Sequence, residues 1–170
     1  MNLNKNIVLL GMMGSGKSSI GHILSKSLNL KFVDIDKKIE ELTNLNIHDI
    51  FEKKGEIFFR LEEEKITLKF LKNKKQIISL GGGAFINKNI RREVLSNNLS
   101  FWLNWKSSTI IKRIYKSKKR PIAFKSSEND LRKLINERSK IYSKANFRIN
   151  CENLTKSMIV KRIIELNEKN

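Results

Sequence analysis

The sequence predicts an α/β protein, a three-layer α/β/α sandwich around a five-stranded parallel sheet. Two observations support this prediction. Short apolar runs alternate along the chain with longer stretches whose apolar residues recur at helical spacing. Strands that alternate with helices favour a parallel sheet with helices on both faces. The 170 residues contain no internal repeat and no linker-like segment, so we expect a single domain over residues 1–170.

Five short runs are the expected strands. Their residues are mostly β-branched, aromatic or leucine, the side chains that suit a buried strand. In chain order they are Lys5–Leu10, Lys31–Asp34, Gln76–Leu80, Phe101–Leu103 and Phe147–Asn150.

Seven longer stretches are the expected helices, because their apolar residues recur every three or four positions. Thr43–Asn44 and Gly55 interrupt this spacing, and Ser107 is expected to cap a helix whose isoleucines face inward. In chain order the stretches are about Gly16–Leu28, Lys37–Leu42, Ile47–Phe70, Asn87–Leu95, Ser107–Lys116, Asn129–Ala145 and Thr155–Asn167.

A glycine-rich motif directly follows the first expected strand. Residues 11–18 read G-x-x-x-x-G-K-S, the pattern of a phosphate-binding P-loop. Its glycines let backbone N–H groups point inward, where they hold phosphates together with the N-terminus of the next helix. In such a loop Lys17 reaches the β- and γ-phosphates, and the Ser18 hydroxyl is a ligand of Mg²⁺. The expected nucleotide-binding residues here are Gly14, Ser15, Gly16, Lys17, Ser18 and Ser19.

Two acidic residues follow the second expected strand, in Asp34-Ile35-Asp36. The carboxyl ends of parallel strands meet at one edge of the sheet, and open α/β sheets bind their ligands there. We therefore expect Asp34 and Asp36 to lie at the same edge as Lys17 and Ser18.

Three further features carry groups suited to ligand binding. Arg60 and Glu63, three positions apart on an expected helix, are close enough to pair. The triple glycine at 81–83 follows an expected strand, where missing side chains let a ligand approach the backbone; a plain flexible turn is the alternative. Arg138 and Tyr142 lie one helical turn apart.

The helical pattern breaks after Lys116. The segment over about residues 116–127 begins with basic residues and contains Arg120 and the one proline, Pro121. It is a candidate mobile lid rich in anion-binding groups, and a solvated surface loop is the alternative.

The formal net charge of +18 raises the question of nucleic acid. The lysines are spread over the whole chain with many asparagines and isoleucines, as in a genome-wide compositional bias. No aromatic residues are interleaved with them to stack on bases. We therefore expect no nucleic-acid partner, although a positive field helps to collect anionic substrates such as ATP.

Three features of the sequence bear on where in the cell the protein is located. No apolar run approaches the ~20 residues that span a bilayer. The first strand begins within a few residues of Met1, which leaves no room for a signal segment. The one cysteine, Cys151, excludes an intrachain disulfide. We expect a cytoplasmic protein, a monomer without a membrane partner.

The P-loop predicts nucleoside triphosphate binding and leaves GTPase, ATPase and kinase activities open. A guanine-reading N-K-x-D stretch is absent, and the chain is short for a GTPase or a motor. Acidic residues, a glycine platform and several arginines at one edge favour phosphoryl transfer to a small anionic acceptor. The alternatives are another small P-loop kinase, of the gluconate or nucleotide type, and a basic nucleic-acid-binding ATPase.

Further short motifs follow the P-loop in a defined order. They are D-x-D at Asp34–Asp36, F-R-x-x-E at Phe59–Glu63, G-G-G at Gly81–Gly83, R-P at Arg120–Pro121 and E-R-x-x-x-Y at Glu137–Tyr142. With these motifs the chain resembles the shikimate kinase family over nearly its whole length. The resemblance implies a P-loop kinase fold with a mobile lid and transfer of the ATP γ-phosphate to the 3-hydroxyl of shikimate. That reaction belongs to the chorismate route to aromatic amino acids, and Mg²⁺ is the implied cofactor.

The resemblance also implies roles for the acceptor-binding residues. Arg60 and Arg138 correspond to a clamp for the shikimate carboxylate, which a planar guanidinium can bind through two hydrogen bonds. Gly82 lies against the substrate ring. Asp36 hydrogen-bonds the reacting diol and accepts the hydroxyl proton, and Glu63 orients the neighbouring arginine.

At the nucleotide end, the resemblance implies that Ser18 binds Mg²⁺ directly and that Asp34 binds it through water. Arg120 would reach the transferring phosphate when the lid closes, and Arg113 corresponds to a position that stacks on adenine. The implied catalytic residues are Lys17, Asp36 and Arg120.

The chain departs from the family pattern at two places. Ile122-Ala123-Phe124 follows the lid R-P, where leucines are common in the family. The segment Asn146–Cys151 matches only loosely, so no adenine contacts are assigned to it.

Overall fold

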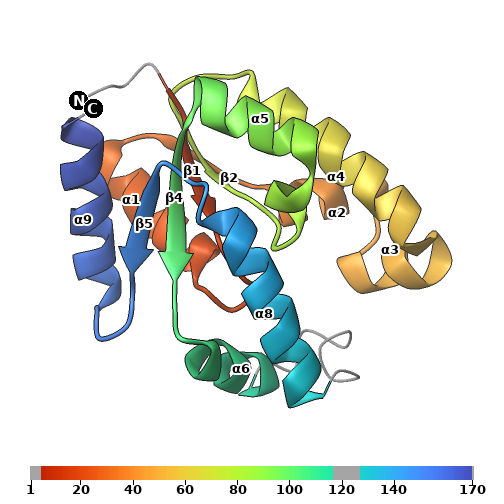
Figure 1. Ribbon diagram of the computed structural model, residues 1–170. Helices are drawn as coiled ribbons and strands as arrows, with labels where there is room; N and C mark the ends of the chain where they lie inside the picture. Colours follow the sequence, from red (N-terminus) through yellow and green to blue (C-terminus); the bar gives the residue numbers. More distant parts are fainter. Residues whose placement is uncertain (1–4, 117–126, 170) are drawn as a thin grey trace.

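The computed structural model describes residues 5–116 and 127–169, and it confirms the expected alternation of strands and helices (Figure 1). Five parallel strands form one sheet in the order β2-β3-β1-β4-β5. The strands are β1 (Ile7–Leu10), β2 (Lys31–Asp34), β3 (Gln76–Ser79), β4 (Leu99–Asn104) and β5 (Phe147–Asn150). The helices are α1 (Lys17–Leu28), α2 (Ile35–Thr43), α3 (Ile47–Lys53), α4 (Gly55–Leu71), the 3₁₀ turn η1 (Ala84–Ile86), α5 (Lys88–Asn97), α6 (Ser107–Lys116), α8 (Glu128–Tyr142) and α9 (Lys156–Glu168).

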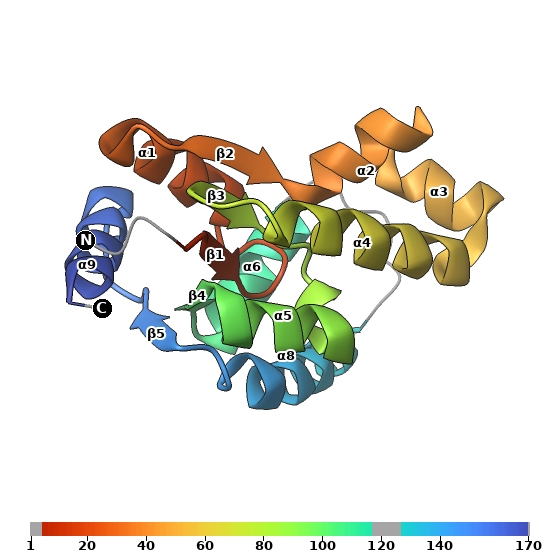
Figure 2. The same cartoon turned by 90° about the horizontal axis from the view of Figure 1, so that it is seen from above.

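The apolar core lies on both faces of this sheet. Successive side chains of a strand point to opposite faces, and β1 is buried along its whole length. Ile7 and Leu9 belong to the cluster that contains α1 and α9, whereas Val8 and Leu10 belong to the cluster of the opposite helical layer. Figure 2 shows α1 and α9 on one side of the sheet and α4, α5 and α8 on the other. Each fully buried aliphatic side chain contributes about 1.5–3 kcal/mol to this packing.

The first residues of two helices differ from the prediction. α2 begins at Ile35, so Asp36 lies in its first turn, where the helix dipole favours a carboxylate. Ser107 is the first residue of α6 rather than its N-cap, because the Lys106 carbonyl accepts the first helical hydrogen bond from Ile110 N–H.

Helix α8 has its own cap. The Ser127 side chain accepts a hydrogen bond from Asp130 N–H in a reciprocal capping box, and the helix ends at Tyr142 rather than at Ala145. The predicted interruption at Gly55 is confirmed, since this glycine has φ +82° and begins α4. The 3₁₀ turn η1 was not predicted, because three residues are too few to produce a periodic pattern.

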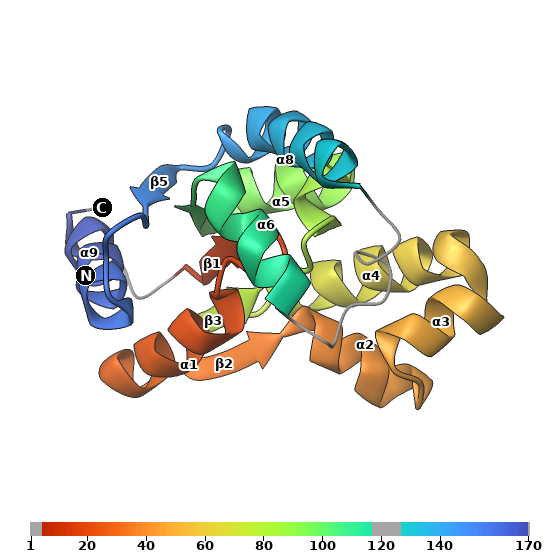
Figure 3. The ribbon, with the colours of Figure 1, turned by 90° about the horizontal axis from the view of Figure 1, so that it is seen from below.

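The carboxyl edge of the sheet is the place where the motifs meet (Figure 3). The segments that leave β1, β2 and β3 are the P-loop, the start of α2 and the triple glycine, and the strands that precede them are paired neighbours. Helices α2 and α3 pack on α4, and these helices extend the molecule beside the edge strand β2. Among residues 5–116 and 127–169, no helix is long and apolar enough to cross a membrane.

Candidate active site

The P-loop takes the backbone conformation that its glycines allow. Gly11, Gly14 and Gly16 have φ values of +143°, +81° and +90°, which side-chain-bearing residues rarely adopt. A Cβ on Gly11 would also lie 2.9 Å from the Leu103 carbonyl of β4. The buried Lys17 ammonium donates hydrogen bonds to the carbonyls of Gly11 (2.8 Å) and Met12 (3.0 Å). The cation is therefore held over the loop that would bind the phosphates.

Ser18 and Asp34 lie in direct contact across the strand–helix junction. Ser18 Oγ donates a hydrogen bond of 2.6 Å to Asp34 Oδ2. Hydroxyl and carboxylate oxygens are the ligands that Mg²⁺ prefers, and protein sites supply one or two of them beside substrate phosphates and water. Within the described ranges, no group of three or more His, Cys, Asp or Glu residues could hold a metal. The donor set fits an Mg²⁺ ion shared with nucleotide phosphates rather than an all-protein metal cage.

The triple glycine is the platform on which the residues predicted to bind the acceptor converge. A Cβ on Gly81 would lie 2.6 Å from Glu63 Oε1 and 2.7 Å from Asp36 Oδ1. A Cβ on Gly83 would lie 2.5 Å from Arg60 Nη1. Real Cβ atoms essentially never lie so close to another atom, so a side chain at Gly81 or Gly83 would displace the ends of these carboxylate and guanidinium side chains. Residues 81–83 therefore pack against side chains of α2 and α4, and their use in ligand binding stays a prediction.

Arg60 is fixed by two carboxylates on its own helix. Its Nη1 donates to Glu63 Oε2 at 2.7 Å, and its Nε and Nη2 both donate to Glu56 Oε1 at 3.2 Å. Burial works against the charged guanidinium, yet Glu63 and Glu56 together hold its pKa above the usual value. The expected pairing of Arg60 with Glu63 is confirmed.

Glu63 is the buried carboxyl of this cluster. Only 2% of its surface is exposed. Burial raises the pKa of Glu63, and Asp36 adds to the rise, while Arg60 and Arg138 oppose it. These opposing effects show that the two carboxyls and the two arginines lie within electrostatic reach of one another.

Arg138 reaches the same platform from α8. Its Nη1 donates a hydrogen bond of 3.2 Å to the Gly82 carbonyl, and the buried Tyr142 hydroxyl donates to that carbonyl as well. A Cβ on Gly82 would meet Met13 N at 3.3 Å and Arg138 Nη1 at 3.6 Å. The platform therefore links α8 to the P-loop. Burial raises the pKa of Tyr142 to about 12, so its hydroxyl stays a donor at any ordinary pH.

Arg113 lies beside the P-loop. Its Nη1 donates to the Gly14 carbonyl at 3.3 Å, and its guanidinium carbon lies 3.7 Å from the centre of the Trp105 ring. The sequence patterns do not single out Trp105, and they mark Tyr142 only through its spacing from Arg138 and its place in the E-R-x-x-x-Y motif. The position of Trp105 just after β4, at the ligand-binding edge of a parallel sheet, was a signal that could have identified it.

The structure brings most of the predicted site residues together at the carboxyl edge. Lys17, Ser18, Asp34 and Arg113 belong to the P-loop side, and Asp36, Arg60, Gly82 and Arg138 to the glycine-platform side. Ser19 is exposed in the first turn of α1. Arg120 and nearly all of the predicted lid at about 116–127, including Pro121 and the segment 122–124, lie outside the described residues.

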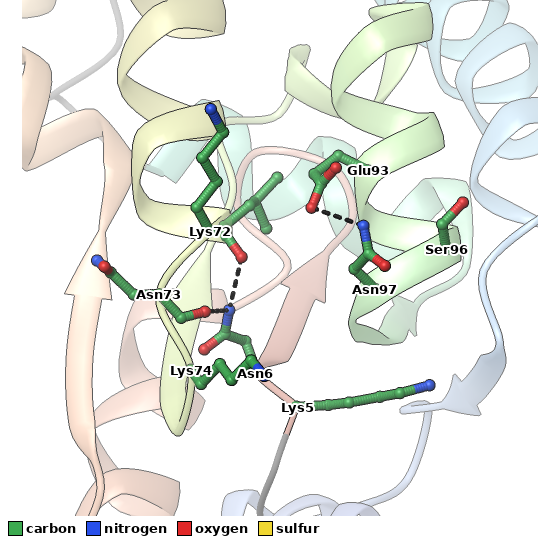
Figure 4. A pocket seen from close by; sticks show the side chains of 9 residues that line it. Lys5, Asn6, Lys72, Asn73, Lys74, Glu93, Ser96 and Asn97 are labelled. Carbon is green, nitrogen blue, oxygen red and sulfur yellow. Dashed lines mark hydrogen bonds between the residues drawn. The ribbon is translucent and has the colours of Figure 1, made fainter.

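The opposite edge of the sheet also has a surface pocket, of about 430 Å³, but none of the motif residues lines it (Figure 4). Asn6, at its base, is already used in the fold: its amide donates to the carbonyls of Leu71 and Asn73 and to Asn98 Oδ1, and its oxygen accepts from Gln76 N–H. The pocket thus marks a structural junction at the amino edge, away from the motifs.

Comparisons with known proteins agree with this geometry. The family model described as shikimate kinase matches residues 13–168. The shikimate kinase of Sulfurihydrogenibium sp. is 41% identical over 160 residues, which cover 94% of this chain and 96% of that protein. The shikimate kinase of Bacillus subtilis is 40% identical over 167 residues, with 95% and 88% covered.

Solved structures of shikimate kinases also resemble this chain. A shikimate kinase from Acinetobacter baumannii in complex with shikimate superposes with a TM-score of 0.92 at 30% identity, covering 99% of this chain and 95% of that one. A deoxyadenosine kinase from M. mycoides, at 19% identity and a TM-score of 0.70, covers 97% and 100% of the two chains and shares the fold alone. With the P-loop, the glycine platform and the arginines that meet there, the chain belongs to the shikimate kinase family.

Proposed function

We propose that this protein transfers the γ-phosphate of ATP to the 3-hydroxyl of shikimate, giving shikimate 3-phosphate for the synthesis of chorismate and aromatic amino acids. The observation that carries the proposal is the glycine platform: residues 81–83 bring Asp36, Arg60 and Arg138 together beside the P-loop. Family membership and the Acinetobacter baumannii relative solved with shikimate support it.

The two arginines are suited to the carboxylate of the acceptor. Arg60 comes from α4 and Arg138 from α8, and both guanidinium groups contact the platform. A guanidinium binds a carboxylate through two parallel hydrogen bonds, which fixes orientation as well as position. With no side chain at Gly82, the acceptor ring can lie directly against the backbone.

Asp36 is suited to accept the proton of the attacking hydroxyl. In a loose phosphoryl-transfer transition state, the protein mainly positions the reactants and stabilises charge. The Asp36 carboxylate lies at the platform edge nearest Glu63, and both carboxyls approach Gly81. Glu63 places a second carboxyl beside Asp36, and the nearby Arg60 and Arg138 offset its negative charge. Asp36 can therefore act as the proton acceptor.

The phosphate end of the reaction falls to the P-loop. Lys17 would move from the Gly11 and Met12 carbonyls to the β- and γ-phosphates, while backbone N–H groups of the loop hold the other phosphate oxygens. Ser18 and Asp34 would hold Mg²⁺, Asp34 through water. When bound, the ion neutralises the negative charge that develops on the phosphates. Arg120, outside the described residues, is the proposed further charge on the transferring phosphoryl group.

The proposal also covers the domain organisation, oligomeric state, location and partners of the protein. Residues 1–170 act as one P-loop kinase domain with a lid at about 116–127, and the protein works as a monomer in the cytoplasm. Its partners are ATP and shikimate, without nucleic acid or membrane. Size-exclusion chromatography with light scattering would test the monomer directly.

A coupled assay of ADP formation tests the proposed reaction. With Mg²⁺ and ATP, we expect turnover to depend strongly on added shikimate and to be negligible with gluconate or a nucleoside monophosphate in its place. DNA or RNA should give no stimulation. ADP formation that ignores shikimate, or that follows one of the other acceptors, would refute the assignment.

A further inference from the structure

Trp105 joins the P-loop to the segment that follows β4. Its indole Nε1 donates a hydrogen bond of 3.0 Å to the Ser15 carbonyl, across 90 positions of sequence. The half-buried ring packs against both apolar clusters of the core, so it is held from both sides of the sheet. A backbone carbonyl of the phosphate-binding loop is therefore tied to a rigid aromatic side chain.

The start of α6 next to Trp105 is also anchored. Glu152, in the segment after β5, accepts a hydrogen bond from Lys106 N–H (3.2 Å) at one oxygen and from Thr109 Oγ1 (2.8 Å) at the other. These contacts, chiefly the one with Thr109, hold the pKa of Glu152 below its usual value. The backbone on the C-terminal side of Trp105 thus has little freedom to shift.

Arg113 extends from α6 over the ring of Trp105. The guanidinium carbon lies 3.7 Å from the ring centre, which is van der Waals contact between two flat groups. The guanidinium edge donates to the Gly14 carbonyl at 3.3 Å. Indole and guanidinium therefore hold adjacent carbonyls of the same loop, at Ser15 and Gly14.

A guanidinium has two flat faces, and Trp105 covers one of them. Arg113 is only partly buried and lies within hydrogen-bond distance of the loop that holds phosphates. A flat aromatic group joined to those phosphates through a sugar could stack on the second face. Stacking of this kind does not depend on hydrogen bonds to the edges of the base.

We propose that Trp105 is a positioning residue for nucleotide binding: its ring holds the Arg113 guanidinium flat beside the P-loop, so that the base of the nucleotide completes a three-layer stack of indole, guanidinium and base. This inference rests on the proposed use of ATP and is independent of the acceptor. Trp105 acts through Arg113 and does not contact the reacting atoms.

Equilibrium binding of ADP and of inorganic tripolyphosphate, measured by titration calorimetry on the full chain, tests the proposal. Trp105→Leu, which removes both ring and N–H, should raise the Kd of ADP about 3- to 30-fold. The Kd of tripolyphosphate, which has no base, should change by less than about twofold. Trp105→Phe keeps an aromatic ring under Arg113 and should restore most of the ADP affinity.

A double-mutant cycle separates a positioning role from a merely structural one. In an Arg113→Ala background, Trp105→Leu should weaken ADP binding by no more than about a further twofold, because its effect passes through Arg113. Arg148→Ala is the matched control, since Arg148 also stacks on a tryptophan, Trp102, at 4.9 Å, but lies exposed on β5. It should leave the Kd of ADP unchanged.

Three results would overturn the proposal: unchanged ADP affinity in Trp105→Leu, equal losses for ADP and tripolyphosphate, or full additivity with Arg113→Ala. If Trp105→Leu fails to fold, the chain's two tryptophans still permit a test. ADP should then change the tryptophan emission of the unaltered protein. It should not change the emission of Trp105→Phe, in which Trp102 is the one remaining tryptophan. The absence of a change in the unaltered protein would overturn the proposal. Because binding is read directly, failure of the shikimate assay would not affect these results.

Discussion

Arg138 Nη1 donates a hydrogen bond of 3.2 Å to the carbonyl oxygen of Gly82, which joins helix α8 to the segment after β3. The Tyr142 hydroxyl, one helical turn further on, donates to the same oxygen. One backbone carbonyl thus positions two side chains of α8 at the edge of the sheet. On the other side of the glycine platform, Arg60 approaches Gly83 closely. The acceptor end of the proposed site depends on this shared contact.

Arg60→Ala and Arg138→Ala should each weaken acceptor binding, because each removes one half of the proposed carboxylate clamp. A lost hydrogen bond between charged groups predicts a rise of about 10- to 150-fold in the KM for shikimate. The KM for ATP should change little. Steady-state kinetics with each substrate varied in turn would measure this difference.

Arg132→Ala is the control for the clamp, since Arg132 is an exposed arginine of the same helix α8 that pairs with Glu128. It should leave both KM values unaltered. Equal losses of affinity for shikimate and ATP in the clamp variants would argue against separate acceptor and nucleotide ends.

Asp36→Asn should lower kcat by about 10²- to 10⁴-fold, since an amide cannot take up the proton of the attacking hydroxyl. Asparagine keeps the shape and one oxygen of the side chain, so the KM for shikimate should change less than kcat. Single-turnover measurements at saturating substrate would isolate the chemical step.

Asp49→Asn, in the surface helix α3, is the control for loss of a carboxylate. This variant should have the kcat of the unaltered protein. If Asp36→Asn kept a near-normal kcat, Asp36 would only position the substrate.

Tyr142→Phe should remove one of the two donors to the Gly82 carbonyl. Because Arg138 still donates there, we expect the free energy of unfolding to fall by about 0.5–1.5 kcal/mol. Urea denaturation would measure this fall in the free energy of unfolding. The KM for shikimate should rise more than the KM for ATP, because the platform loses support. Tyr115→Phe, which changes an exposed tyrosine on α6, is the control. Equal stability of Tyr142→Phe and the unaltered protein would contradict a supporting role for the hydroxyl.

Glu63 should make stability depend on pH. Burial raises the pKa of this carboxyl in the folded protein above its ordinary value of 4.5, despite the opposing effect of Arg60. Between these two pKa values the folded state binds more protons than the unfolded chain. The contribution of Glu63 to the free energy of unfolding is therefore fully present below about pH 4.5 and is lost as the pH rises through the folded-state pKa.

Glu63→Gln removes that titration. The free energy of unfolding of the unaltered protein, minus that of Glu63→Gln, should decrease as the pH rises above about 4.5 in urea denaturation experiments. Glu62→Gln, at the partly exposed neighbouring position, should leave a difference that varies less with pH. A difference that increased with pH would mean that the pairing with Arg60 outweighs the burial of Glu63.

Much of the fold and of the phosphate end of the site was predictable from local pattern. The strands β1, β3 and β4 are short runs of mostly buried residues, and the periodicity of 3.6 located the helices to within a few residues. The P-loop was predictable for a related reason: its glycines, Lys17 and Ser18 are contiguous, so their spacing in sequence is also their spacing in space. Helix ends were less predictable, because single capping hydrogen bonds such as that of Ser127 decide them.

The acceptor end depended on contacts between distant segments. By itself, the sequence determined the alternation of strands and helices, the phosphate-binding loop and, through motif order, the resemblance to a family. Only the tertiary structure decided that Gly81 lies against Glu63 and Asp36, that Tyr142 bonds to Gly82, and that Trp105 lies beneath Arg113. The physical reason is that local preferences and hydrophobic periodicity act over a few residues. These contacts depend on the strand order and on how the helical layers pack, and neither is encoded in the spacing of any one motif.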